Sequence, residues 1–153
     1  MEKIIGQPEC VICDIDGTVA DISHRQHYVM NRPKNWKMFN HTMHLDQPNY
    51  DIIWLIKMMQ AAGVTVLMAS GRSEDQREVT EIWLREVATI TYTKLYMRPS
   101  KDNRSDDIIK AEILEQMWHD GYIPTMAIDD RNKVCDMWRA NGLRCLQVAP
   151  GNF

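Results

Sequence analysis

The pattern of hydrophobic and polar residues divides the chain into alternating apolar runs and amphipathic segments. Apolar runs rich in β-forming residues, typical of strands buried in a sheet, occur at residues 3–13, 64–69, 89–97, 124–128 and 143–148. Helical spacing of apolar residues predicts helices at residues 48–63, 74–87, 106–119 and 132–140. Strands that alternate with helices predict an α/β fold: a three-layer parallel sheet with helices on both faces.

Residues 17–47 interrupt this alternation and show no clean hydrophobic period. They mix basic and aromatic side chains: Arg25, Arg32, Lys34, Lys37, Tyr28, Trp36 and Phe39. Long segments of this kind often serve as lids or binding flaps. The alternative is an ordinary surface excursion with a small apolar cluster of its own. We expect one domain over residues 1–153, with a small flap at about residues 17–47 in place of a large cap.

Composition and charge narrow the class of protein. The 153 residues are 44% hydrophobic and 25% charged, as in soluble globular proteins. The net charge of −3 gives no global basic field for nucleic acid, so such contact would need a local patch. The sequence contains neither an apolar run long enough for a membrane span nor a signal-peptide core, so we expect a cytoplasmic protein without membrane contact. Its four cysteines lie in or beside apolar runs and are expected to be core thiols.

Polar side chains follow the predicted strands at the points where they end. Asp14 and Asp16 close the first strand on one face, Ser70-Gly71-Arg72 follows the second, and Asp129-Asp130 follows the fourth. Because the carboxyl ends of parallel strands meet at one edge of the sheet, we expect these groups to lie together.

Lys110, early in the third helix, is expected to join them. Asp106 lies one turn before it on the same face. An ordinary ion pair between the two is the alternative interpretation.

This set of residue types is suited to phosphoryl transfer. The oxygen-rich corner of Asp14, Asp129 and Asp130 suits Mg²⁺. The Ser70 hydroxyl and the backbone N–H groups that follow it, from Gly71 on, can hold phosphate oxygens, and Lys110 and Arg72 can offset phosphate charge. One aspartate can attack phosphorus while a second transfers protons. A zinc hydrolase lacks its histidine cluster here, and a P-loop kinase is excluded because G-x-x-x-x-G-K does not occur.

These motifs resemble the haloacid dehalogenase (HAD) superfamily of phosphotransferases. Asp14-Ile15-Asp16-Gly17-Thr18 is similar to its first motif, Ser70 to its second, Lys110 to its third and Asp129-Asp130 to its fourth. More narrowly, the chain resembles the 3'-phosphatase domains of bacteriophage polynucleotide kinase/phosphatases, in segments that run from residue 14 to Phe153. The resemblance implies a HAD-like (Rossmannoid) fold, Mg²⁺, and a polynucleotide or nucleotide 3'-phosphate as substrate.

The resemblance also implies roles for individual residues. Asp14 would be the nucleophile and Asp16 the general acid/base, while Ser70 and Lys110 would hold the phosphate. Mg²⁺ would be bound by Asp14, the backbone carbonyl of Asp16, and Asp130, with Asp129 supporting Lys110 or the metal's water. The family's substrate-contacting arginines correspond to Arg25, Arg72 and Arg98, and its essential acidic residue before the lysine corresponds to Asp106.

One departure from the family keeps other functions open. The family's proteins carry a kinase domain ahead of the phosphatase domain, and these 153 residues contain none. We therefore expect a separate kinase or ligase as a possible partner. The alternatives are a small-molecule phosphatase that acts on nucleotides or sugars, a phosphatase subunit of a separate repair assembly, and a binding module without activity.

Overall fold

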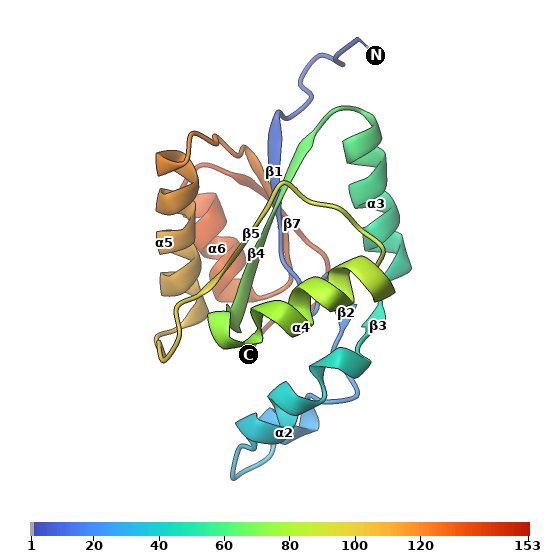
Figure 1. The fold of residues 1–153 in the computed structure, drawn as a ribbon. Helices are drawn as coiled ribbons and strands as arrows, with labels where there is room; N and C mark the ends of the chain where they lie inside the picture. The colour runs from blue at the N-terminus through green and yellow to red at the C-terminus, as the bar shows by residue number, and fades with distance from the viewer. Residues whose placement is uncertain (1) are drawn as a thin grey trace.

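A computed structural model describes residues 2–153, and its centre is a five-stranded parallel sheet (Figure 1). The strands lie in the order β5 (Lys94–Arg98), β4 (Thr65–Ser73), β1 (Cys10–Cys13), β6 (Met126–Asp129) and β7 (Arg144–Gln147). The central strand β1 pairs in parallel with β4 on one side and with β6 on the other. The predicted parallel α/β sheet is confirmed.

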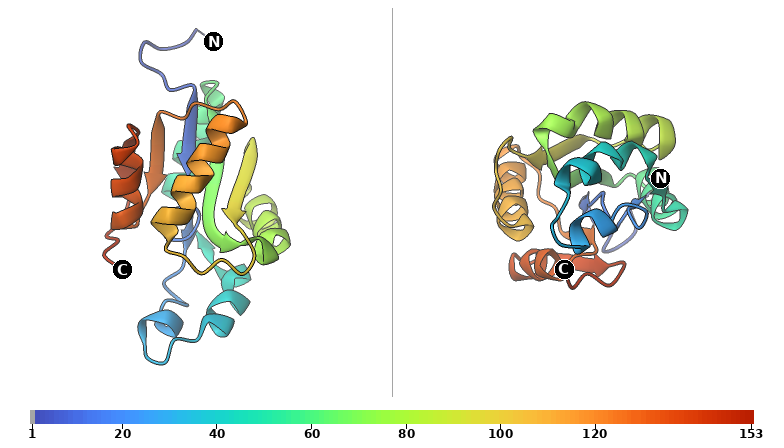
Figure 2. Two further views of the ribbon diagram at one scale, coloured as in Figure 1. Left: turned by 90° about the vertical axis from the view of Figure 1, so that its left-hand side faces the viewer. Right: turned by 90° about the horizontal axis from the view of Figure 1, so that it is seen from below.

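Helices cover both faces of this sheet, which gives the three predicted layers (Figure 2). One face carries α3 (Tyr50–Ala61) and α4 (Arg77–Ile82), which continues as the π-helical turn η3 (Trp83–Val87). The other face carries α5 (Asp106–His119) and α6 (Asn132–Ala140). Alternate residues of β1 reach the two cores: Val11 and Cys13 pack with α3 and η3, whereas Cys10 and Ile12 pack with α5 and α6. The thiols of Cys10 and Cys13 are free and buried, as expected of core cysteines.

Residues 17–47, which we call the flap, extend beyond the carboxyl end of the sheet (Figures 1 and 2). Two short antiparallel strands, β2 (Ala20–Asp21) and β3 (Gln47–Pro48), form its stem. Between them lie α1 (His27–Met30), α2 (Trp36–His41) and the 3₁₀ turn η1 (Met43–Leu45). A second 3₁₀ turn, η2 (Glu74–Gln76), follows β4 in the main body. The flap helices have at most six residues each, too few to produce a detectable helical period in the sequence.

Two predicted strand boundaries are wrong. The first strand begins at Cys10 rather than residue 3, because pairing starts where Cys10 meets Thr65 and earlier residues have no neighbouring strand. The side chains of Ile4 and Ile5 are accordingly exposed. The second strand continues past residue 69 as β4 and reaches Ser73, with an irregular register between Ser70 and Ser73 that bends the strand end over the site.

Each helix within residues 2–153 is too short or too polar to cross a lipid bilayer.

Candidate active site

A buried cluster of three carboxylates and one ammonium lies at the carboxyl ends of β1 and β6. Carboxylate oxygens of Asp14, Asp129 and Asp130 lie within 4.8 Å of one another. Lys110 Nζ donates to Asp14 Oδ1 at 2.7 Å and to Asp129 Oδ2 at 2.8 Å. The structure thus brings Lys110 into contact with Asp14, which lies 96 positions earlier in the sequence. Lys110 pairs with these two aspartates, and the alternative ion pair with Asp106 does not form within residues 2–153.

The loop after Asp14 fits closely around this cluster. Thr18 Oγ1 donates to Asp14 Oδ2 at 2.9 Å, which fixes the second oxygen of that carboxylate. Gly17 adopts the left-handed conformation with φ +82°. A Cβ atom at this position would lie 2.1 Å from Asp130 Oδ2, so a side chain there would displace the Asp130 carboxylate. Position 17 therefore requires glycine for two reasons: the left-handed backbone conformation and the close approach of the Asp130 carboxylate.

The charges within the cluster do not balance. Burial raises the pKa of Asp14 well above its usual range, and Asp129 adds to this rise although Lys110 opposes it. Burial also raises the pKa of Asp130 to about 6, again with a contribution from Asp129. Burial lowers the pKa of Lys110, but the charges of Asp129 and Asp14 outweigh this effect and leave it raised. Three carboxylates beside one ammonium form a site that favours an added cation.

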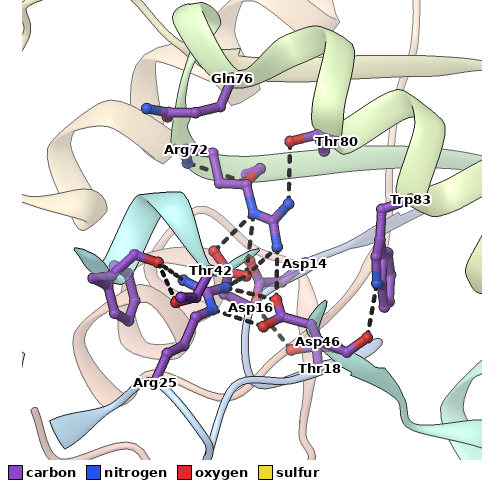
Figure 3. Close-up of polar contacts among 12 residues, drawn as sticks. Asp14, Asp16, Thr18, Arg25, Thr42, Asp46, Arg72, Gln76, Thr80 and Trp83 are labelled. Carbon is purple, nitrogen blue, oxygen red and sulfur yellow. Dashed lines mark hydrogen bonds and ion pairs between the residues drawn. The ribbon is translucent and has the colours of Figure 1, made fainter. Parts of the chain in front are cut away.

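Asp16 faces a second cluster, made with two arginines from different elements (Figure 3). Arg72 at the end of β4 donates through Nη2 to Asp16 Oδ1 at 2.6 Å and through Nε to Asp16 Oδ2 at 3.1 Å. Arg25 in the flap donates to the same Asp16 Oδ1 at 2.7 Å. Burial tends to raise the pKa of Asp16, but the two arginines more than offset this and hold it at about 2.

Asp46 completes this cluster and was not predicted from the sequence. Its carboxylate accepts from Arg25 Nε and Nη2, both at 2.7 Å, and from Arg72 Nη2 at 3.1 Å. Its backbone oxygen accepts from Trp83 Nε1 at 2.9 Å. A single aspartate at the end of an aperiodic segment carries no sequence signal for burial, because its partners come from the flap and from β4 and η3.

The remaining predicted residues form a third group at the rim. Arg98 donates through Nε to the Gly71 carbonyl at 2.8 Å, through Nη1 to two carbonyls of the following loop, and through Nη2 to Asp106. Asp106 also accepts from Arg131 Nη1 at 2.5 Å, a contact that the sequence did not predict. A Cβ at position 71 would lie 2.8 Å from Asp106 Oδ1. The proposed substrate roles of Arg98, Gly71 and Asp106 stay predictions.

Ser70 lies fully buried where β4 bends. Its hydroxyl oxygen accepts from the backbone N–H of Arg72 at 3.1 Å. The contact fixes the turn that carries Arg72 toward Asp16, and the phosphate-binding role of the hydroxyl stays a prediction.

Comparison with known proteins identifies this arrangement. Residues 8–153 match the family described as the polynucleotide kinase PNKP phosphatase domain. A protein of Autographa californica nuclear polyhedrosis virus, assigned as a bifunctional polynucleotide kinase/RNA ligase, is 29% identical over 133 residues, which cover 86% of this chain and 18% of the viral protein.

Solved structures agree with this match. A protein in the Pnkp1/Rnl/Hen1 complex is 34% identical with a TM-score of 0.81, covering 100% of this chain and 49% of that one. A haloacid dehalogenase-like hydrolase from Streptococcus pneumoniae, 14% identical, has a TM-score of 0.63 over 91% of this chain and 83% of its own, which confirms the HAD-like fold. The chain thus spans about half the length of the first of these proteins. Taken with the family match, these findings show that the chain belongs to the family of PNKP-type polynucleotide phosphatase domains, within the HAD fold.

Proposed function

We propose that the protein is a Mg²⁺-dependent phosphomonoesterase that removes 3'-phosphates from polynucleotide or nucleotide ends. The observation that carries the proposal is the Asp14 carboxylate, buried at the end of β1 and held between Lys110 and Thr18 beside two further aspartates. Membership of the polynucleotide phosphatase family supports this substrate class.

The donor set of the acidic cluster fits Mg²⁺, which prefers carboxylate oxygens and retains several waters. Asp129 already uses Oδ1 to accept from the backbone of Asp130, and Oδ2 to accept from Lys110 and Trp138 Nε1. Each Asp14 oxygen accepts only one hydrogen bond, whereas Asp129 Oδ2 accepts two. Asp14 and Asp130 are therefore the side chains best able to hold the ion, with the backbone carbonyl of Asp16 as a further ligand. When bound, Mg²⁺ would offset the negative charge of the carboxylates and of the incoming phosphate.

The proposed reaction proceeds in two steps through an aspartyl phosphate. An Asp14 carboxylate oxygen attacks phosphorus, the bond from phosphorus to the 3' oxygen breaks, and Asp16 gives its proton to the leaving oxygen. A water molecule then attacks the same phosphorus and gives a proton to Asp16. The bond from Asp14 to phosphorus breaks, which releases inorganic phosphate and leaves Asp14 ionised and Asp16 protonated, as they were at the start. Ser70 and Lys110 are proposed to hold the phosphate oxygens throughout.

The acid role of Asp16 sets a condition on substrate binding. With its carboxylate held by Arg25 and Arg72, its pKa of about 2 keeps it ionised near neutral pH. To donate a proton, Asp16 needs at least one of these arginines to turn toward the phosphate. Binding of the dianionic phosphate supplies that attraction. Arg25 and Arg72 are thus proposed to contact substrate and, by doing so, to release Asp16.

The size of the flap supports a polymeric substrate, and the similar proteins support a kinase or ligase as a partner. The flap is short and helical, and we propose that it leaves the site open enough for a polymer end. The viral relative is assigned kinase and ligase activities, and the structural relative belongs to a Pnkp1/Rnl/Hen1 complex. We propose that this phosphatase likewise works with a kinase or ligase in nucleic acid repair.

The test is a substrate screen of the purified protein with Mg²⁺ or with EDTA. Phosphate release is compared on oligonucleotides with 3'-phosphate or 5'-phosphate ends, on 3'-mononucleotides, and on sugar phosphates. We expect Mg²⁺-dependent release from 3'-phosphate ends, and none by Asp14→Asn, which removes the nucleophile. Preference for sugar phosphates would instead favour the small-molecule alternative, and full activity of Asp14→Asn would reject Asp14 as the nucleophile.

A further inference from the structure

A pocket of about 290 Å³ opens beside the acidic cluster, between the base of the flap and the last residues of the chain. Gly17 and Asp130 line it, so a molecule in the pocket lies next to the oxygens proposed to hold Mg²⁺. Its size is at the lower end of the range for small-ligand sites and suits a single nucleoside rather than several. Viewed along the sheet from the flap side, the end of the chain lies beside the flap (Figure 2).

The charges of the residues that line the pocket indicate which part of a substrate can bind there. Its lining includes the carboxylates of Asp21 and Asp130, and none of its lining residues is a lysine or arginine. A second phosphate is therefore disfavoured there, whereas a neutral base and sugar are not. Ser23 and Gln26 also line the pocket, and the Gln26 amide makes no hydrogen bond within residues 2–153, which leaves its polar atoms available to a ligand.

Phe153 presents an aromatic ring at this pocket. Its side chain is half-exposed although large apolar side chains gain from burial. The ring is fixed by Arg131, whose guanidinium carbon lies 5.1 Å from the ring centroid and whose Nε donates to the Phe153 backbone oxygen at 2.8 Å. Arg131 is in turn fixed by Asp106. An exposed ring in a defined position is suited to stacking against a nucleobase.

The segment that carries Phe153 is also held against the acidic cluster. Gly151 packs so closely that a Cβ there would lie 1.9 Å from the backbone oxygen of Asp130. The Gly151 carbonyl accepts from the backbone N–H of Asn132 at 2.9 Å. The distance between the ring and the acidic cluster is therefore set by backbone packing rather than by a free tail.

We propose that this pocket binds the nucleoside that carries the scissile phosphate, with the Phe153 ring stacked on its base. Phe153 is then a specificity-determining residue that distinguishes nucleotide ends from other phosphate esters. The proposal rests on the proposed function and deepens it, because it names the part of the substrate that the protein reads beyond the phosphate.

The experiment compares two oligonucleotides that end in a 3'-phosphate and differ only in the terminal residue, which is a normal nucleoside or an abasic tetrahydrofuran. We expect Phe153→Ala to lower kcat/KM roughly 5- to 100-fold on the nucleoside end, the range expected for loss of one stacking contact. The loss on the abasic end should be far smaller, and Phe153→Trp should restore the preference. Equal losses on both ends, or no loss on either, would overturn the proposal.

Binding measured without turnover separates this proposal from the proposed function. The Asp14→Asn protein, with and without Phe153→Ala, is titrated with the same two oligonucleotides and their affinities are compared. We expect tighter binding of the nucleoside end, and expect this preference to disappear with Phe153→Ala. If binding still depends on the base but the wild-type protein hydrolyses neither oligonucleotide, the proposed phosphatase function is rejected and the proposed nucleoside pocket is supported. If the wild-type protein hydrolyses both ends without any dependence on the base, the proposed nucleoside pocket is rejected and the proposed phosphatase function is supported.

Discussion

Arg25 and Asp46 form a bidentate ion pair in which neither side chain is exposed to solvent. Both residues belong to the flap, and Arg72 connects the pair to the end of β4 by its contacts with Asp46 and Asp16. The flap is thereby fixed over the site by two arginines and two aspartates whose charges cancel. Such a balanced buried network is stable only while all of its members are present.

Replacing Asp46 tests this network. Asp46→Asn leaves two buried guanidinium groups with one carboxylate, and breaking a buried pair of this kind costs about 3–5 kcal/mol. We expect a lower free energy of unfolding in urea and faster proteolytic cleavage within the flap. The matched control is Asp51→Asn at the exposed start of α3, which should change stability by less than about 0.5 kcal/mol. Wild-type stability and protease resistance in Asp46→Asn would contradict the role of the ion pair.

Gly17 tests the geometry of the acidic cluster. Gly17→Ala should weaken Mg²⁺ binding by about 10- to 100-fold, the usual effect of disturbing the surroundings of a metal ligand, because its Cβ would displace Asp130. Gly63→Ala is the control, since Gly63 has a similar φ of +87° but nothing within 4 Å of the added atom. Both changes carry the cost of a left-handed backbone, about 1 kcal/mol. Isothermal titration with Mg²⁺ should distinguish them, and equal affinities would count against the predicted displacement.

Lys110 and Arg98 should differ in their effects on small phosphate esters. Lys110 contacts Asp14 directly, so Lys110→Ala should lower kcat about 100- to 1,000-fold, as expected when a preorganised electrostatic contact is lost. Arg98 donates to Gly71, to Asp106 and to the loop that follows Arg98 itself, so Arg98→Ala should act on small esters through stability more than through chemistry. The measurement is the rate of hydrolysis of a generic aryl phosphate by each variant, well below its unfolding temperature, so that lost chemistry is separated from lost stability. Losses of similar size would refute the distinction.

The raised pKa of Asp130 predicts how stability depends on pH and Mg²⁺. Its folded-state pKa of about 6 exceeds the value of about 3.9 in an unfolded chain, so the folded state binds the proton more tightly. This contribution to stability is full below about pH 4 and is lost as the pH rises through 6. Mg²⁺ should therefore raise the melting temperature more at pH 7.5 than at pH 5.5, where protons already compensate part of the charge.

The control for this prediction is the same pair of melting curves on Asp130→Asn. That variant lacks both the titrating group and a proposed Mg²⁺ ligand, so its melting temperature should respond weakly to Mg²⁺ at either pH. If Mg²⁺ raises the melting temperature of the wild-type protein equally at both pH values, the titration of Asp130 does not control the stabilisation by Mg²⁺.

The sequence predicted the parts of the fold and site that depend on periodicity and on strand ends. Asp14, Asp129 and Asp130 come together because the carboxyl ends of parallel strands meet at one edge of the sheet, a rule that needs no knowledge of the loops. The start of β1 was less predictable, because Ile4 and Ile5 are as apolar as strand residues and differ from them only in having no neighbouring strand.

The arginine network was beyond prediction for a different reason. The burial of Asp46 depends on the position of a flap whose helices are one or two turns long, and their amphipathic pattern is too short to recognise. Arg131 was missed because its partners, Asp106 and Phe153, lie more than twenty positions away in the sequence and reach it only in the folded chain. Contacts between segments distant in sequence carry no local signal.

The burial of Lys110 also makes this lysine chemically distinct from the others. The Lys110 residue is 2% exposed and its amine is paired with two carboxylates, whereas lysines such as Lys34 and Lys101 are exposed. An acylating reagent, which needs a free and deprotonated amine, would modify those lysines first and reach Lys110 only when the helix that carries it separates from the sheet. The acylation rate at this one position, followed by mass spectrometry, would thus report how often the acidic cluster opens to solvent.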